Sequence, residues 1–115
     1  MCLDPYLLSM PLSTQTKDQI LALLATVEVC SLEGSFTGSE KIIAPDVIVF
    51  APGLEHHGRE GFSPKPLTFS GMDVKGEGVI AWVSGECTYG GVASRFTAVL
   101  RGTGHAWELV QLHIA

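Results

Sequence analysis

The hydrophobic residues in the last third of the chain fall into three runs separated by glycine-containing turns. The runs are Val79–Tyr89, Val92–Arg101 and Ala106–Ile114, and they are rich in β-branched and aromatic side chains. Gly90-Gly91 separates the first two runs, and paired glycines between apolar runs favour a hairpin because its turn needs positive φ. A second glycine-containing turn at 102–104 precedes the third run. The pattern therefore predicts a meander of three antiparallel strands.

The turns also predict which side chains share a face of this meander. The first turn places Glu86 opposite Arg95. A two-residue second turn places Arg95 beside Leu112, and Thr97 beside Val110. One face then carries Ile80, Trp82, Ser84, Glu86, Arg95, Thr97, Val99, Val110, Leu112 and Ile114. The other carries Ala81, Val83, Cys87, Ser94, Phe96, Ala98, Leu100, Trp107, Leu109, Gln111 and His113. A one-residue slip in the second turn would turn the whole last strand over. Both faces are mainly apolar, so we expect one to cover a core or pocket and the other to meet a second subunit.

Apolar residues nearer the N-terminus recur at helical spacing. Ser13-Thr14 supplies an N-cap, and the apolar periodicity runs up to Gly34, which predicts a helix from about Gln15 to Leu32. A second, short helix is expected over Phe36–Ile43. Residues 1–13 are expected to form an N-terminal arm, and residues 14–115 a single domain. The arm is interpreted as a partly ordered terminus or, alternatively, as a segment that packs on a neighbour or caps a pocket.

The middle of the chain predicts two further strands. Asp46–Ala51 is one, closed by Pro52-Gly53, and Leu67–Asp73 is the other. Leu54–Pro66 between them is expected to be a loop. The order is thus helix, short helix, strand, loop and four strands.

Composition narrows the class of protein. The chain has 115 residues, of which 46% are hydrophobic and 17% charged, and this excludes a disordered chain. Its net charge of −5 argues against nonspecific nucleic-acid binding and against an anionic membrane surface. No apolar run approaches the roughly 18 residues of a spanning helix, and the N-terminus lacks the basic region of a signal peptide. Cys2, Cys30 and Cys87 fit free thiols in a reducing cytoplasm.

Several stretches occur in a distinctive order. They are Ala44–Gly53, then Gly58–Glu60, then Ala81–Gly85, and finally Arg95–Arg101 with Trp107–His113. In this order they resemble the nuclear transport factor 2-like superfamily, which includes ketosteroid isomerase and SnoaL-like polyketide cyclases. The resemblance spans most of Asp18–Ala115 and implies an α+β fold, with N-terminal helices packed on a curved, mainly antiparallel β-sheet in a cone shape. That fold normally carries a third helix after Gly58–Glu60, which we expect to be missing or reduced to one turn, since glycine and proline follow.

The resemblance argues against ketosteroid isomerase activity. Its carboxylate base falls at Ala51, which cannot take a proton, and its acidic donor falls near Thr97. The long predicted helix also has no tyrosine to act as a donor. Whether the protein is an enzyme of another kind stays open.

The same resemblance places the concave face of the sheet on a set of candidate ligand-binding residues. They are Trp82, Glu86, Arg95, Thr97 and Leu112. One interpretation of Glu86 and Arg95 is a structural cross-strand ion pair. The other is a polar handle in an apolar pocket, with Arg95 binding a carboxylate or carbonyl and Glu86 as the candidate catalytic base.

Other polar groups are not expected to form sites. Ser94 and His113 lack an acidic partner, and Cys87 is expected about 9–10 Å from His113, two strand spacings away. His56-His57 has no third ligand at useful spacing, so neither a metal nor another cofactor is expected.

Three functions follow as hypotheses. The first is a SnoaL-like protein that binds a small hydrophobic molecule in the concave pocket. The second is a cofactor-independent cyclase, isomerase or hydratase. The third is a homo-oligomeric assembly module without a pocket. A homodimer or higher homo-oligomer located in the cytoplasm is expected, without nucleic-acid or membrane partners.

Overall fold

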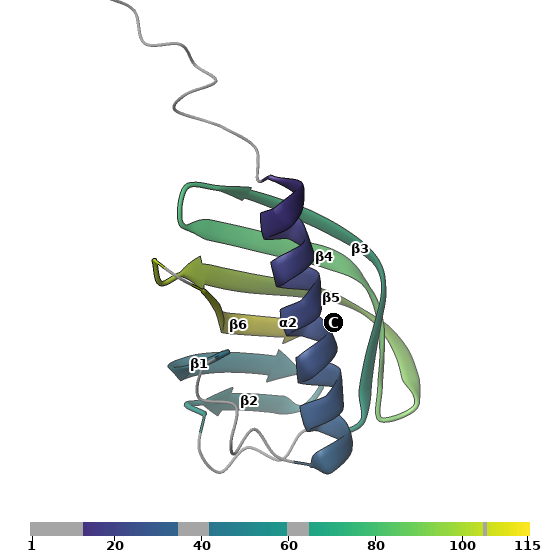
Figure 1. The fold of residues 1–115 in the computed structure, drawn as a ribbon. Helices are drawn as coiled ribbons and strands as arrows, with labels where there is room; N and C mark the ends of the chain where they lie inside the picture. The colour runs from purple at the N-terminus through teal and green to yellow at the C-terminus, as the bar shows by residue number, and fades with distance from the viewer. Residues whose placement is uncertain (1–12, 35–41, 60–64, 105) are drawn as a thin grey trace, which may run out of the picture.

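A long helix lies across one face of a six-stranded sheet (Figure 1). The structure is a computed structural model that describes residues 13–34, 42–59, 65–104 and 106–115. Its elements are α2 (Thr14–Glu33), β1 (Ile43–Ala51), β2 (Leu54–His57), β3 (Leu67–Glu77), β4 (Ile80–Tyr89), β5 (Val92–Gly102) and β6 (Trp107–Ile114). The strand order is β2-β1-β6-β5-β4-β3, in which only β1 and β6 run parallel. The expected α+β class is confirmed.

Capping and amphipathicity explain the limits of α2. The Ser13 side chain accepts a hydrogen bond from the backbone N–H of Thr16 at 3.1 Å. Gly34 ends the helix with φ of 76°, in the left-handed conformation that suits glycine. The sequence placed this helix correctly to within a residue at each end. In the described part of the chain, no helix is long and apolar enough to cross a membrane.

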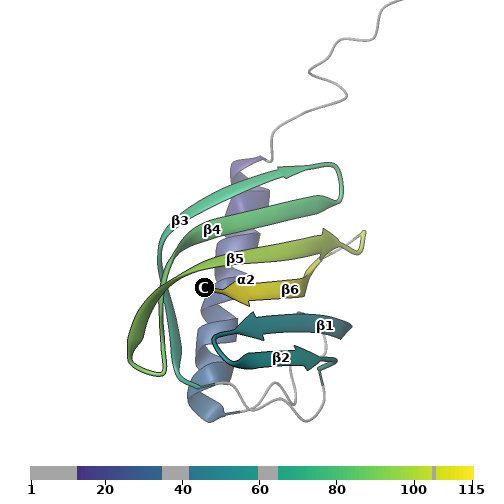
Figure 2. The same ribbon diagram turned by 180° about the vertical axis from the view of Figure 1, so that it is seen from behind.

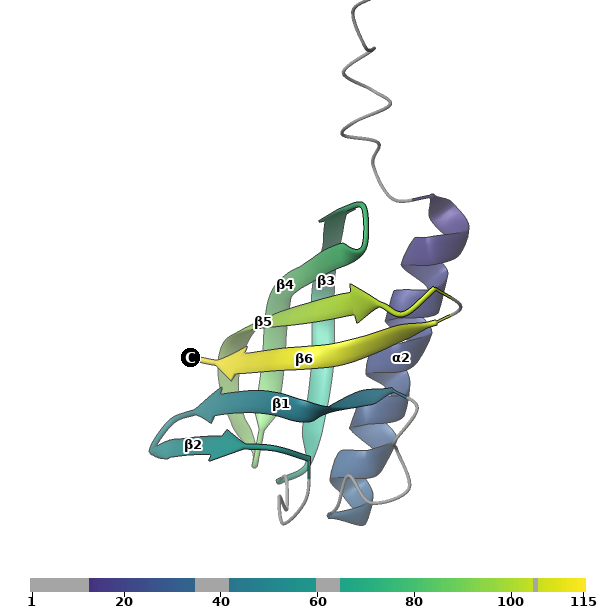
Figure 3. The ribbon, with the colours of Figure 1, turned by 90° about the vertical axis from the view of Figure 1, so that its left-hand side faces the viewer.

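The core lies between α2 and the sheet face that it covers. From the helix, the buried residues are Ile20, Leu23, Leu24, Val27, Cys30 and Ser31. From the sheet, they are Ile43, Val47, Val49, Ala51, Leu67, Phe69, Val74, Ala81, Val83, Cys87, Phe96, Ala98, Leu100, Leu109, Leu112 and Ile114. Figure 3 shows the helix on this one side of the sheet. We call the opposite surface of the sheet the open face.

Two polar side chains of α2 fasten it to β3. The Ser31 hydroxyl accepts a hydrogen bond from the backbone N–H of Leu67 at 2.9 Å. The Glu28 carboxylate accepts one from the backbone N–H of Phe69 at 2.7 Å. Both bonds satisfy backbone donors in a largely apolar setting, where an unpaired donor is costly.

A bulge in β3 bends the sheet. Residues 71 and 72 lie opposite Gly85 alone, because the register shifts between Ser70 and Asp73. A Cβ on Gly85 would lie 2.7 Å from the carbonyl oxygen of Ser70 and 2.9 Å from that of Gly71, so only glycine fits there. Bulges bend strands and increase their twist, and β3, β4 and β5 curve strongly in Figure 2.

The meander is confirmed, but the expected position of β6 is wrong. Glu86 pairs with Arg95 as expected. However, β5 and β6 pair from Gly102 with Trp107, so four residues separate them rather than two. A further register shift then places Leu112 opposite Ala98 and not beside Arg95. The turn is longer than expected by two residues, and an even change leaves each side chain on its expected face. The register shift between Val99 and Leu100 adds a single residue to β6, and this turns the end of the strand over.

The consequence is a change of face for four residues at the end of β6. Leu112 and Ile114 face α2 and are 1% and 2% exposed. Gln111 pairs with Val99 and His113 with Thr97, on the other side of the sheet. Val110, expected beside Thr97, is displaced from that position.

The middle of the chain differs from expectation in one further respect. Leu54–His57, expected to be part of a loop, forms β2 and pairs antiparallel with β1. Its sequence lacks β-branched residues, and the turn at Pro52-Gly53 brings it into register instead. Ile43, expected to end a short helix, begins β1.

Some expectations fall outside the described residues. They concern the N-terminal arm up to residue 12, the short helix over residues 36–41 and most of the region of the reduced third helix, at 60–64.

Candidate functional site

The open face of the sheet carries the side chains that alternate with the buried core. Across β4 and β5 they pair in register as Trp82 with Val99, Ser84 with Thr97, and Glu86 with Arg95. In the part of the chain that the structure describes, no helix covers this face (Figure 3). The open face is therefore accessible to a ligand or to another protein.

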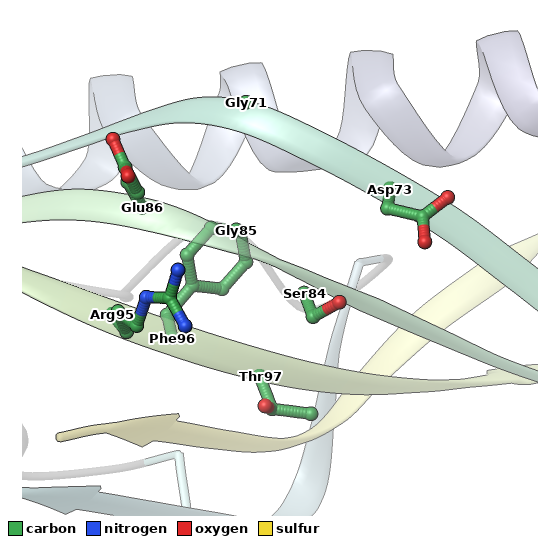
Figure 4. Close-up of a pocket in the computed structure, with 8 residues that line it drawn as sticks. All are labelled: Gly71, Asp73, Ser84, Gly85, Glu86, Arg95, Phe96 and Thr97. Atoms are coloured by element: carbon green, nitrogen blue, oxygen red, sulfur yellow. The ribbon is translucent and has the colours of Figure 1, made fainter.

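A hollow of about 420 Å³ lies on the open face where the strands bend. Its lining residues are Gly71, Asp73, Ser84, Gly85, Glu86, Arg95, Phe96 and Thr97 (Figure 4). The glycines belong to the bulge, and their lack of side chains leaves space between the polar groups. We call this site the Arg95 hollow.

The charged groups of the Arg95 hollow are not paired with one another. Among the described residues, the side chains of Arg95 and Glu86 form no hydrogen bond or ion pair. Figure 4 shows their charged ends apart, although the two residues are opposite in the ladder. The carboxylate of Asp73 lies 3.5 Å from the ammonium group of Lys75, and both side chains are well exposed. The guanidinium of Arg95 thus has its donors available to a ligand.

The residues predicted to bind a ligand are only partly brought together. Glu86, Arg95 and Thr97 all line the Arg95 hollow. Trp82 lies further along the same face and is 39% exposed. Leu112 lies on the helix side of the sheet, so it does not share this surface with the others.

The structure also separates Ala51 and Thr97, the two positions at which the sequence resemblance placed catalytic groups of ketosteroid isomerase. Ala51 is buried among the core residues that face α2. Thr97 is exposed on the open face. Side chains at these two positions point to opposite sides of the sheet and cannot act on one substrate atom.

Sequence reasoning missed Asp73, Ser84 and the two glycines as parts of one site. The position of Asp73 depends on the bulge, because each residue inserted in a strand changes the pairing beyond it. Glycine inside an otherwise β-rich run is a signal for a bulge. Gly85, inside the run Val79–Tyr89, could therefore have predicted the bulge.

The remaining polar candidates lie apart. His113 faces Thr97 and not Ser94, and its ring meets Phe50 edge-on at 6.0 Å. Burial raises the pKa of the Cys87 thiol, which makes it a poor nucleophile at neutral pH. The Nε2 atom of His57 lies 3.0 Å from the carboxylate of Glu55 on the surface. Within the described ranges, no group of three or more His, Cys, Asp or Glu side chains could hold a metal ion.

Comparison with known proteins places the fold. No family model matches the chain, and no curated protein matches its sequence. A solved protein of unknown function with a cystatin-like fold, from Nostoc punctiforme PCC 73102, has a TM-score of 0.73 at 16% identity, covering 91% of this chain and 93% of that one. A protein of unknown function from Pseudomonas putida KT2440, described as NTF2-like, has a TM-score of 0.65 at 19% identity, covering 90% and 87%.

A third similar structure is the CamKII hub homology domain of Chlamydomonas reinhardtii. Its TM-score is 0.65 at 18% identity, and the match covers 86% of this chain and 96% of that one. The chain therefore has the nuclear transport factor 2-like fold. At these identities the likeness concerns the fold, which hosts many unrelated functions.

Proposed function

We propose that the protein binds a small molecule in the Arg95 hollow, with a carboxylate or carbonyl group on Arg95 and an apolar part directed along the open face toward Trp82 and Val99. The observation that carries this proposal is the guanidinium of Arg95, which lines the hollow and has no partner in the described chain. The exposed side chain of Trp82 lies four residues further along the same face. Arginine presents a planar set of donors that matches a carboxylate with two parallel hydrogen bonds.

The other charges of the hollow limit the class of ligand. Glu86 and Asp73 are both carboxylates, so they repel a ligand with several negative charges. The hydroxyls of Ser84 and Thr97 can donate to or accept from a polar substituent. A monocarboxylate with an aromatic or aliphatic body fits these groups best.

Phenylacetate and its neutral relative 2-phenylethanol make a matched pair of probes for this proposal. Phenylacetate should raise the melting temperature of the protein, and 2-phenylethanol should raise it less, since a ligand stabilises the state that binds it. Arg95→Ala should abolish the difference between the probes, and Arg95→Lys should keep part of it. Lys17→Ala removes the same charge from an exposed position of α2, on the other side of the sheet, and serves as the control. Equal shifts in all variants would refute the proposal.

A second candidate function is self-assembly through the open face. Trp82 and Ile80 are 39% and 40% exposed there, and apolar groups that stay exposed on a monomer often mark interfaces. The face also carries both Glu86 and Arg95, so two copies related by a two-fold axis could pair these charges reciprocally. The similar fold of a hub homology domain supports this candidate.

Sedimentation over a range of protein concentrations separates the two candidates. Assembly predicts a dimer that Trp82→Lys dissociates, while Val29→Ser, which changes an exposed apolar residue of α2, leaves it intact. A monomer at all concentrations that still responds to phenylacetate would leave ligand binding as the function. A dimer that does not respond to phenylacetate would leave assembly.

A further inference from the structure

A groove runs beside the N-terminal half of α2, on the side of the sheet that faces away from the Arg95 hollow. It consists of two adjoining hollows of about 400 Å³ and 350 Å³. Both are lined by Gln19, Ala106 and Trp107. We call it the Trp107 groove.

The two ends of the Trp107 groove differ in the elements that line them. One end lies between the first turns of α2 and the two turns that join β3 to β4 and β5 to β6, where Val79 is 63% exposed. The other end continues along α2 past Leu23 to Thr26 and reaches Ile42 before β1. Trp107 and Ile42 are half-buried apolar residues packed against the core. The first end is lined mainly by polar residues and glycine, whereas the second offers an apolar strip at Leu23, Ile42 and Trp107 that no described residue covers.

The N-terminal segment of the chain joins α2 at Ser13, at the end of the helix where this groove begins. Ser13 is the N-cap of α2, and residues 1–12 precede it directly. Twelve residues can span up to about 40 Å when extended. The groove follows α2 from Gln15 to Thr26, which is about 17 Å at 1.5 Å per residue. The segment is therefore long enough to reverse direction and follow the whole groove.

The apolar composition of this segment matches the apolar strip of the groove at Leu23, Ile42 and Trp107. Its apolar residues include Tyr6, Leu7, Leu8, Met10 and Leu12. Apolar side chains gain free energy by leaving water for an apolar surface, and a segment tethered at the mouth of its site has a high effective concentration there. The segment carries one charged side chain, Asp4, so little desolvation opposes its docking.

We propose that residues 1–12 dock in the Trp107 groove of their own chain, with their leucine side chains against Trp107, Leu23 and Ile42. The inference is independent of the proposed ligand site, because that site lies on the open face of the sheet.

Fluorescence of Trp107 tests the docking directly. The chain has two tryptophans, so Trp82→Phe leaves Trp107 as the single reporter in the full-length protein. In this background, Leu7→Ser with Leu8→Ser should raise the acrylamide quenching constant of Trp107 at least about twofold and shift its emission to the red, since the indole becomes exposed. Leu54→Ser, an exposed leucine in β2, is the matched control and should change neither. Unchanged quenching in the double variant, with its circular dichroism intact, would overturn the proposal.

A second measurement needs no change to the leucines. A nitroxide is attached at Ser9→Cys in a Cys2→Ser background, since Cys30 and Cys87 are buried. Docking predicts that the amide signals of Gln19, Val79 and Ala106 broaden in the same molecule. Broadening that appears only in isotope-labelled protein mixed with nitroxide-carrying protein would place the segment on a second copy and overturn docking in the same chain, as would no broadening at these amides.

Discussion

Arg95 and Glu86 face one another across β4 and β5, yet their side chains form no ion pair. Elsewhere on β5, Arg101 does bind across strands, with its guanidinium 2.6 Å from the Glu108 carboxylate of β6. That contact holds the pKa of Arg101 above its ordinary value through the hydrogen bond from its side chain to Glu108. The two arginines of β5 therefore differ in role: Arg101 forms an ion pair within the fold, whereas the guanidinium of Arg95 is available to bind a ligand.

This difference predicts that Arg95 contributes little to stability. Arg95→Ala should change the free energy of unfolding by less than about 0.5 kcal/mol, because the residue is exposed and unpaired. Urea denaturation followed by circular dichroism measures it. A loss well beyond that limit would show that Arg95 is structural and would weaken its assignment to a ligand.

Gly85 should be far less tolerant than its neighbours. Gly85→Ala places a methyl group against the carbonyl oxygens of the β3 bulge, and such overpacking costs about 1–3 kcal/mol. Ser84→Ala, one residue earlier and exposed, is the control and should be nearly neutral. If the two variants unfold at the same urea concentration, the bulge does not constrain Gly85 as described.

Ser31 should be a structural residue of the helix–sheet contact. Ser31→Ala leaves the backbone N–H of Leu67 without its acceptor in a buried position, which costs about 1–3 kcal/mol. Hydrogen exchange of the Leu67 amide should accelerate along with the loss of stability. Ser70→Ala, an exposed serine on the same strand, should change neither quantity.

Cys87 should make stability fall at alkaline pH. Its pKa is raised from the model-compound value of 9.0 because burial disfavours the thiolate. The folded state therefore binds the proton more tightly than the unfolded state does. This contribution is complete below the unfolded pKa and is lost as pH rises through the folded pKa. The stability advantage of the parent over Cys87→Ala should shrink from pH 7 to about pH 10; an advantage that grows over that range would contradict the shift.

Local sequence signals were sufficient to predict the elements whose ends are set by capping or turn residues. Ser13 and Gly34 mark the two ends of α2, and the pair Gly90-Gly91 alone gives the full register of β4 and β5. In these cases the residues that decide the structure lie next to the element they define. The α+β fold class was implied by the resemblance to the nuclear transport factor 2-like superfamily.

The candidate site depended on features that act at longer range. The extra residue in β6 turns Leu112 toward the core, and no residue of the preceding turn predicts this register shift. The bulge at Gly71 and Gly85 brings Asp73 to the Arg95 hollow. Its position can be assigned only when the pairing of β3 with β4 is known. The sequence could therefore propose Arg95 but not the group of residues around it.

An NMR titration of the isotope-labelled protein with phenylacetate tests the central claim most directly. Binding in the Arg95 hollow predicts saturable shifts of the backbone amides of Ser84, Gly85, Arg95 and Thr97, with one common dissociation constant. These shifts should be absent in Arg95→Ala. No saturable shift at these amides, or shifts confined to Gln19, Ala106 and Trp107 in the groove beside α2, would contradict the assignment of the Arg95 hollow as the ligand site.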